Sequence, residues 1–239
     1  MTELGATREA EIAAGLAAVR ARIDAACRAA GRDPQDVRLV VVTKTFPASD
    51  VRVLAGLGCT DVGENRDQEA RAKRAELGPS AAGVRWHMIG QLQRNKARSV
   101  AGWADVVESV DRLELAEALS RAAEGAGRRL DALVQVSLDL PPAPARGGAA
   151  PGDVPALARA ITALPGLRLA GVMAVAPHPG DPDEAFARLA EVAEGVRALV
   201  DGPLVVSAGM SDDLEQAIAH GATQVRIGGA VLGNRATLG

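Results

Sequence analysis

The sequence predicts an α/β protein folded as a single (β/α)8 TIM barrel with an additional N-terminal helix. Three observations lead to this prediction: eight short runs rich in apolar and β-branched residues, a helical pattern in each gap between them, and a length of 239 residues, near the roughly 250 typical of such barrels. Repeated strand–helix units give parallel strands with right-handed crossovers. The alternative is an open doubly wound sheet, but no GxGxxG motif follows the first run.

The chain begins with an amphipathic pattern typical of a long helix over about residues 7–30. Apolar residues recur there at spacings of three and four, and Gly31 can end the helix. The residues on this stripe are Ile12, Leu16, Val19, Ile23 and Cys27. No change in composition marks a second domain. We therefore expect residues 1–239 to form one domain, with the barrel over about 37–235.

The remaining chain alternates between strand and helix patterns. Several of the apolar runs have no polar face, which is typical of strands covered on both sides. The expected strands are 38–43, 59–64, 84–89, 105–110, 130–138, 167–176, 203–208 and 223–228. The expected helices between them begin near Ser49, Arg66, Arg94, Asp111, Asp153, Asp183 and Ser211.

Two long connections, 141–152 and 177–182, follow expected strands and lack apolar periodicity. In a barrel they would lie at the C-terminal face, where active sites are built. For 141–152, which is rich in Pro and Gly, a low-complexity loop without a role in the site is an equal alternative.

Composition excludes several classes of protein. The formal net charge is −3, and the chain has two Trp, two Phe and no Tyr, so it lacks the basic surface and stacking residues of a nucleic-acid binder. Cys27 and Cys59 are too few for a disulfide framework, and the three histidines have no metal-ligand spacing, so no metal is expected. The N-terminus does not resemble a signal peptide, and no run of about 18 apolar residues could span a membrane. We expect a cytoplasmic protein.

Only three of the 27 basic residues are lysines. Lys44 follows the first apolar run, which places it at the mouth of the barrel; the alternative is a solvated lysine at a strand end. Desolvation lowers the pKa of a lysine, and a neutral amine can form a Schiff base with a carbonyl compound. Lys73 lies in a charged helical segment and is expected to be solvated, and Lys96 is expected to be exposed.

Other candidate site residues follow later strands. Asn65 ends the second expected strand, where an amide could bind a ligand oxygen or cap the next helix. The segments 207–218 and 226–233 carry glycine turns after the seventh and eighth strands, the usual phosphate site of these barrels. Ser211 is the expected N-cap of the helix in the first segment. Arg226 can face the interior, where it needs a carboxylate or a ligand atom as acceptor.

A reactive lysine opposite a phosphate site suits a phosphorylated aldehyde, of which pyridoxal 5′-phosphate (PLP) is one. A lysine-dependent aldolase acting on a phosphosugar is an alternative. The chain resembles the pyridoxal phosphate homeostasis protein family, whose barrel is like that of alanine racemase. The segments that carry the resemblance are 42–47, 63–69, 87–96, 171–177, 207–218 and 225–233.

The resemblance implies specific roles for these residues. It implies PLP held as a Schiff base on Lys44, and Asn65 near the ring. It places Arg226 against the pyridine nitrogen. It also implies phosphate binding by a set of serines and glycines, namely Ser207, Ser211 and the backbone around Gly228 and Gly229. The chain departs from many relatives near its end, where it has no Tyr, and in the composition of 141–152.

The implied function is intracellular PLP homeostasis, with delivery of PLP to apo-enzymes as partners. Related racemases use a Tyr from a second domain as acid/base partner, and this chain has no Tyr. Arg226 would leave the ring nitrogen unprotonated and the ring a poorer electron sink. These features favour a carrier over an enzyme; the alternative is weak amino-acid racemase or lyase activity. No dimerisation helix is evident, and a monomer is expected.

Overall fold

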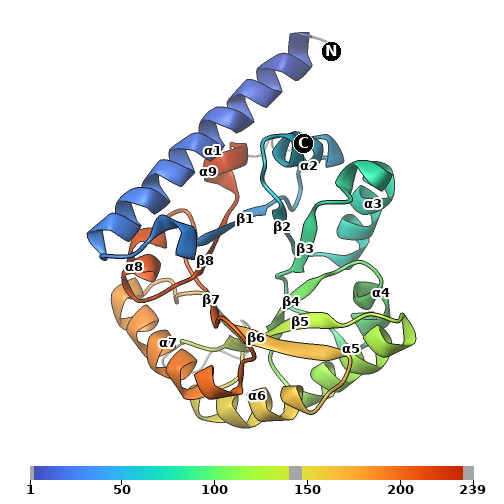
Figure 1. The fold of residues 1–239 in the computed structure, drawn as a ribbon, viewed down its shortest axis with the longest axis vertical. Helices are drawn as coiled ribbons and strands as arrows, with labels where there is room; N and C mark the ends of the chain where they lie inside the picture. The colour runs from blue at the N-terminus through green and yellow to red at the C-terminus, as the bar shows by residue number, and fades with distance from the viewer. Residues whose placement is uncertain (1–2, 140–146, 234–239) are drawn as a thin grey trace.

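Eight parallel strands close into a barrel in sequence order, each hydrogen-bonded to the next and β8 to β1 (Figure 1). The computed structural model describes residues 3–139 and 147–233. The strands are β1 (Arg38–Val42), β2 (Asp61–Glu64), β3 (Arg85–Met88), β4 (Val106–Val110), β5 (Leu130–Val136), β6 (Leu167–Ala174), β7 (Val205–Ser207) and β8 (Gln224–Ile227). The predicted (β/α)8 barrel is confirmed, and each predicted strand contains the observed one.

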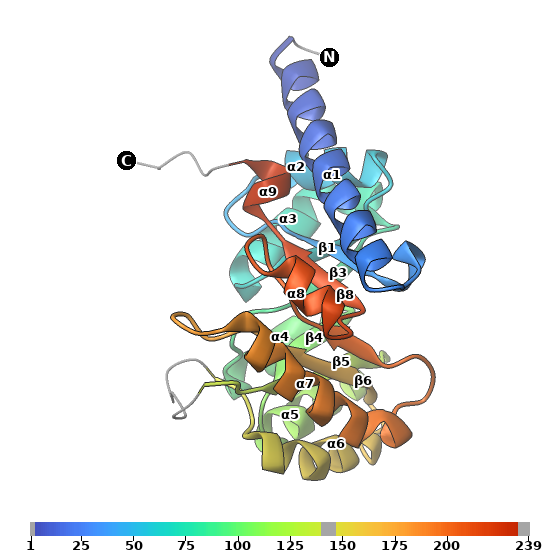
Figure 2. The same ribbon diagram turned by 90° about the vertical axis from the view of Figure 1, so that its left-hand side faces the viewer.

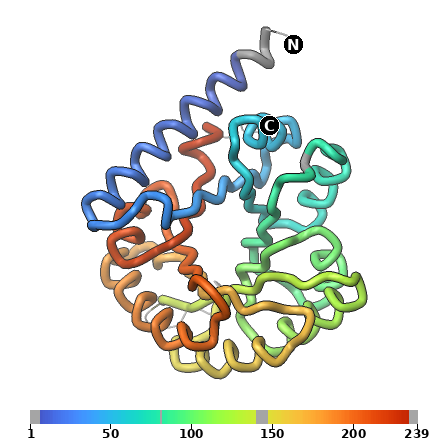
Figure 3. The backbone as a smooth tube through the Cα atoms, in the orientation of Figure 1, coloured from blue at the N-terminus to red at the C-terminus, as the bar shows by residue number. Residues whose placement is uncertain are grey.

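Helices surround the barrel, as the tube in Figure 3 shows. They are α1 (Glu3–Ala29), α2 (Ala48–Gly56), α3 (Asp67–Leu77), α4 (Ala97–Ala101), α5 (Leu113–Gly125), α6 (Val154–Thr162), α7 (Pro182–Val196), α8 (Leu214–Ala219) and α9 (Gly229–Leu232). The predicted starts of α2 to α8 are within three residues of the observed ones. The short helix α9, after β8, was not predicted. Among the residues described, no helix combines the length and apolarity needed to cross a bilayer.

The predicted N-terminal helix is confirmed as α1, which runs along one side of the barrel beside α8 and α9 (Figure 2). The contact with α9 is close, because a Cβ added at Gly15 would lie 2.4 Å from the carbonyl oxygen of Val231. Arg8 strengthens this junction: its guanidinium donates to Asp50 at 2.6 Å and to the carbonyl of Leu232 at 3.0 Å. Helix α1 therefore fixes the position of α9.

The expected cap at Ser211 is wrong. Helix α8 begins at Leu214, and its N-cap is Asp213. The intervening residues form a turn in which the Met210 amide donates to Asp213 Oδ1 at 2.6 Å. The carboxylate of Asp213 stabilises this turn, so Ser211 lies in the turn and not at the start of helix α8. In the predicted long connection after β5, over 141–152, Ala149 pairs with Val136 as a short extension of the sheet. Residues 140–146 lie outside the described residues.

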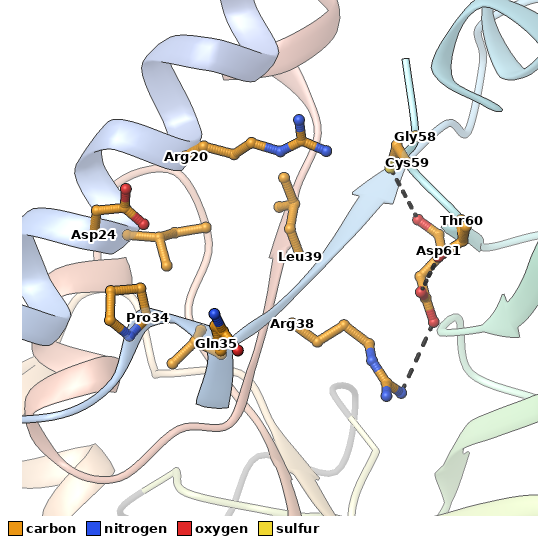
Figure 4. Close-up of a pocket in the computed structure, with 12 residues that line it drawn as sticks. Arg20, Asp24, Pro34, Gln35, Arg38, Leu39, Gly58, Cys59, Thr60 and Asp61 are labelled. Atoms are coloured by element: carbon orange, nitrogen blue, oxygen red, sulfur yellow. Dashed lines mark hydrogen bonds and ion pairs between the residues drawn. The ribbon is translucent and has the colours of Figure 1, made fainter. Parts of the chain in front are cut away.

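The interior of the barrel contains a group of buried polar side chains. Side chains of a strand alternate between the interior and the surrounding helices. His87 of β3 is fully buried, with Nδ1 2.7 Å from Glu108 of β4 and Nε2 3.0 Å from Asp61 of β2. Because each ring nitrogen faces a carboxylate, both can donate only if the imidazole is protonated. Asp61 also pairs with Arg38, whose Nη1 lies 3.9 Å from Asp61 Oδ1. Both residues line a cavity of about 380 Å³ next to α1 (Figure 4).

Burial and pairing oppose each other at these groups. Burial alone would lower the pKa of His87, but the hydrogen bonds and charges of Asp61 and Glu108 outweigh it and raise the pKa. Burial raises the pKa of the two carboxyl groups, but their hydrogen bonds and charge contacts, first among them those with His87, together outweigh burial and lower the pKa of each. The pairing of the imidazolium with two carboxylates is therefore part of what stabilises the folded barrel.

The stability of the fold should decrease as pH rises above the ordinary histidine pKa of 6.5. Because the pKa of His87 is raised on folding, its contribution is complete below that value and is lost as pH rises through the folded pKa. The free energy of unfolding should fall by up to about 1.4 kcal/mol per pH unit in this range. Urea denaturation at several pH values measures it.

His87→Gln should be less stable at low pH and should lack this slope. His220→Gln is the matched control, because His220 lies at the surface beside Asp183. A wild-type slope retained in His87→Gln would contradict the assignment.

Candidate functional site

A cavity of about 680 Å³ opens at the carboxyl ends of the strands. Its lining comes from the ends of several strands and from the loops that follow β1, β7 and β8. The lining residues are Val42, Lys44, Phe46, Asn65, Ile89, Met173, Val175, Met210, Ser211, Asp212, Arg226, Gly228, Gly229 and Gly233. Six of the seven predicted site residues are among them, and Ser207 is not. Residues that the sequence predicted to form one site therefore do line one cavity.

Lys44 reaches this cavity from the turn after β1. Val42 also lines the cavity, whereas the hydroxyl of Thr43 points to the other side of the sheet and donates to Glu64 Oε1 at 2.6 Å. The Phe46 amide donates to the Thr43 carbonyl at 3.0 Å, so 43–46 form a β-turn with Lys44 as its second residue. Lys44 is half-buried and presents its side chain to the cavity.

The expectation that Lys73 is solvated is wrong. Lys73 is 6% exposed and donates to the Thr43 carbonyl at 2.6 Å and to Glu64 and Glu69 at 2.7 Å each. These three oxygens match the three N–H groups of an ammonium, which is why the charge can be buried. The sequence did carry a signal, because Lys73 lies at helical spacing from the apolar residues Ala70 and Leu77. In the structure this face of α3 is buried. Lys96 is exposed, as expected, and lies outside the cavity.

Arg226 forms the floor of the cavity and is 5% exposed. Its Nη1 donates to the hydroxyl of Ser207 at 2.7 Å and its Nη2 to the carbonyl of Ala174 at 2.9 Å. A carboxylate oxygen of Glu108 lies behind, 3.9 Å from Nη1. Burial lowers the pKa of Arg226, although the charge of Glu108 opposes this. Two protein acceptors use only part of the five N–H groups of a guanidinium, so the side chain can also donate to a ligand in the cavity.

Ser207 lies beneath Arg226 rather than at the mouth. Its hydroxyl is buried, donates to Glu108 Oε2 at 2.6 Å, and accepts from Arg226 and, at 2.9 Å, from Gln224. The structure thus connects Arg226 through Ser207 to the interior network around Glu108. Sequence reasoning missed Glu108 and Gln224, although each is a polar residue within an apolar strand, which is a sign of a side chain facing a polar interior.

The loops after β7 and β8, the strands that precede β1 around the closed barrel, form the next part of the rim. Gly209 has φ +93°, and a Cβ there would lie 2.8 Å from Cβ of Ala217, so only glycine allows the loop to pack this closely against α8. This packing holds Ser211 at the cavity. In the loop after the neighbouring strand β8, a Cβ added at Gly229 would meet nothing within 4 Å, so the backbone there is open to a ligand. Asp212 lines the same rim and is exposed.

Apolar side chains form the walls between these polar groups. Val42 ends the first strand and Ile89 directly follows the third, and Met173 and Val175 come from the sixth strand and its continuation. A pocket with apolar walls and a few convergent polar groups is typical of a small-molecule site. An aromatic ring with a polar substituent at each end would match this lining.

Comparisons with known proteins identify the family of the chain. The family described as "Alanine racemase, N-terminal domain" matches residues 15–236. A pyridoxal phosphate homeostasis protein of Mycobacterium bovis is 46% identical, over 95% of this chain and 94% of its own. One from Escherichia coli K12 is 37% identical, over 94% and 97%.

Solved structures extend the comparison to the fold. PipY of Synechococcus elongatus, in a structure with PLP bound, has a TM-score of 0.79 and 34% identity over 93% of this chain and all of its own. Alanine racemase of Corynebacterium glutamicum, at 15% identity and a TM-score of 0.67, covers 97% of this chain and 64% of its own, and shares the fold. From its family match and its near full-length relatives, the chain belongs to the pyridoxal phosphate homeostasis protein family.

Proposed function

We propose that this chain binds PLP in the cavity at the carboxyl ends of the strands, joined to Lys44 as a Schiff base, and delivers it to apo-enzymes. The observation that carries the proposal is that Lys44, Arg226 and the open backbone at Gly229 line one cavity. The names of the relatives support the same ligand, since PipY was solved with PLP and the curated relatives are named for PLP homeostasis.

The lining fits each part of PLP. For the phosphate, the Ser211 hydroxyl and the backbone N–H groups at Gly228 and Gly229 supply donors without burying a counter-charge. For the ring, Val42 and the apolar residues opposite supply flat walls. For the ring nitrogen, the Arg226 guanidinium supplies donors. The volume of about 680 Å³ is within the range of small-molecule sites.

PLP supplies an aldehyde, which condenses with the Nζ amine of Lys44 and releases one water. The protein's part is to hold Lys44 at the mouth and Arg226 at the floor. Because a guanidinium does not give up its proton at ordinary pH, Arg226 acts only as a donor. Ser207 serves the site indirectly in this arrangement, by accepting from Arg226 and linking it to Glu108.

The same geometry favours a carrier over an efficient enzyme. Among the described residues that line the cavity, the ionisable side chains are Lys44, Asp212 and Arg226. Asp212 is exposed at the rim, and the sequence has no Tyr to act as a second acid/base group. Racemisation needs proton transfer on both faces of the substrate, which this set does not supply well. Weak racemase or lyase activity is the alternative that the tests below distinguish.

Lys44→Ala should abolish covalent attachment of PLP. The protein is loaded with PLP, reduced with borohydride and digested, and the mass of the peptide containing each lysine is measured. The unaltered chain should carry the reduced adduct on Lys44. Lys96→Ala is the control and should keep it, because Lys96 is exposed and outside the cavity. An adduct that persists on Lys73 or Lys96 in Lys44→Ala would refute the assignment.

Pyridoxal without its phosphate should bind much more weakly than PLP. Each charge-assisted hydrogen bond lost costs about 1.5–3 kcal/mol, so the dissociation constant should rise by about tenfold or more. Ser211→Ala should weaken PLP but leave pyridoxal unchanged, which makes pyridoxal the internal control. Equal affinities for PLP and pyridoxal would show that the loops at Ser211 and Gly229 do not bind phosphate. Absorbance titration measures both ligands.

The PLP-loaded protein should transfer PLP to an apo-enzyme without racemising alanine. In D₂O, only trace exchange of the Cα hydrogen of L-alanine is expected, with no accumulation of the D-isomer, because a second acid/base group is missing. Restored activity of an added apo PLP-dependent enzyme measures delivery, and NMR measures exchange. Racemisation at about 1 s⁻¹ or faster, within the ordinary range of enzymes, would favour the enzymatic alternative.

A further inference from the structure

The turn that carries Lys44 is held from its outer side by a buried group of charges. This group, the Lys73 cluster, consists of Lys73, Glu64 and Glu69 together with the backbone of Thr43 and Thr45. It lies between the ends of β1 and β2 and helix α3, and none of its members lines the cavity. It is therefore separate from the residues expected to touch PLP.

Both peptide groups that flank Lys44 are bound by this cluster. On the N-terminal side, Lys73 Nζ donates to the carbonyl of Thr43 at 2.6 Å. On the C-terminal side, the amide of Thr45 donates to Glu69 Oε1. The same Glu69 oxygen accepts from Lys73 at 2.7 Å, so the two flanks are joined through one ion pair. The backbone of Lys44 is thereby fixed at both ends.

The conformation held in this way is not one that the chain adopts easily. Thr45 has φ +70°, in the left-handed region that a β-branched residue rarely occupies. Without an external contact, the turn would be expected to relax to a negative φ. Such a change would rotate the preceding peptide and move the side chain of Lys44 relative to the cavity.

Burying the charges of the Lys73 cluster is energetically unfavourable compared with burying apolar side chains in the same space. Glu64 is fully buried, burial raises its pKa despite the contact with Lys73, and its Oε2 has no hydrogen-bond partner among the described residues. Apolar residues of similar volume often stabilise such a position as well as a buried ion pair does. A role in placing the turn accounts for the charges better than a role in stability.

We propose that Lys73, acting with Glu69, is a positioning residue that fixes the 43–46 turn so that the amine of Lys44 meets the aldehyde of PLP. This inference rests on the proposed attachment of PLP at Lys44. It also explains why the second lysine of this region is not an attachment site: its three N–H groups are already bound by three oxygens, and it faces away from the cavity.

The test separates aldehyde-dependent binding from binding of the rest of the ligand. Pyridoxine 5′-phosphate has the ring and phosphate of PLP but an alcohol in place of the aldehyde, so it cannot be joined to a lysine. Lys73→Met and Glu69→Ala should each raise the dissociation constant for PLP by about tenfold or more, the scale of one lost charge-assisted hydrogen bond. Binding of pyridoxine 5′-phosphate should be nearly unchanged. Borohydride trapping on Lys44 should slow by a similar factor.

Two matched variants complete the design. Glu69→Gln keeps an oxygen that can accept from Thr45 and Lys73, and should restore most of the PLP affinity lost in Glu69→Ala. Glu76→Ala, an exposed change on the same helix, should have no effect. Hydrogen exchange at the Thr45 amide should quicken in Lys73→Met and Glu69→Ala but not in Glu76→Ala. If Lys73→Met does not fold, Glu69→Ala decides the question, because Glu69 is only partly buried.

The possible failures are distinguishable. If the unaltered chain forms no adduct on Lys44, the proposed function is wrong. If it forms the adduct and both variants bind PLP and trap it as the unaltered chain does, the positioning role is wrong. Equal weakening of PLP and pyridoxine 5′-phosphate would indicate general disruption of the cavity and would also overturn the positioning role.

Discussion

The burial of Arg226 inside the barrel is the constraint on which the arrangement of the site depends. A guanidinium excluded from water is stable only with acceptors and a nearby negative charge. Ser207 and the Ala174 carbonyl supply the acceptors, and Glu108 supplies the charge. Glu108 in turn is held by His87. The polar interior therefore fixes one end of the cavity, and the pairings around Glu108 set where Arg226 lies.

The cavity is supported from three independent directions. The interior network holds Arg226 from below. Helix α3 holds the turn of Lys44 from outside through Lys73 and Glu69. Helix α1 packs against α9 and holds the backbone near Gly229, which is the first residue of α9. These supports share no side chain, so each can be altered alone. The effects on binding of the PLP ring, on the amine of Lys44 and on binding of the PLP phosphate can then be measured separately.

The barrel and most of the cavity could be predicted because they follow from local patterns. Strand–helix alternation gives the topology, and residues just after parallel strands meet at one mouth, which brings Lys44, Asn65 and Gly228 together. Contacts between distant elements could not be predicted in this way. The helical spacing of Lys73 indicates a buried face, but its partner Glu64 lies on β2, and the position of Ser207 depends on Glu108, about a hundred residues away. Helix α8 begins at Leu214 and not near Ser211 as predicted, because Asp213 stabilises a turn that helix propensity alone does not reveal.

A crystal structure of the PLP-loaded protein tests the central claim most directly. The account predicts continuous density from Nζ of Lys44 to the PLP, with the ring nitrogen at the guanidinium of Arg226 and the phosphate between Ser211 and the backbone of Gly228 and Gly229. PLP bound outside this cavity, or joined to Lys73 or Lys96 instead, would contradict it.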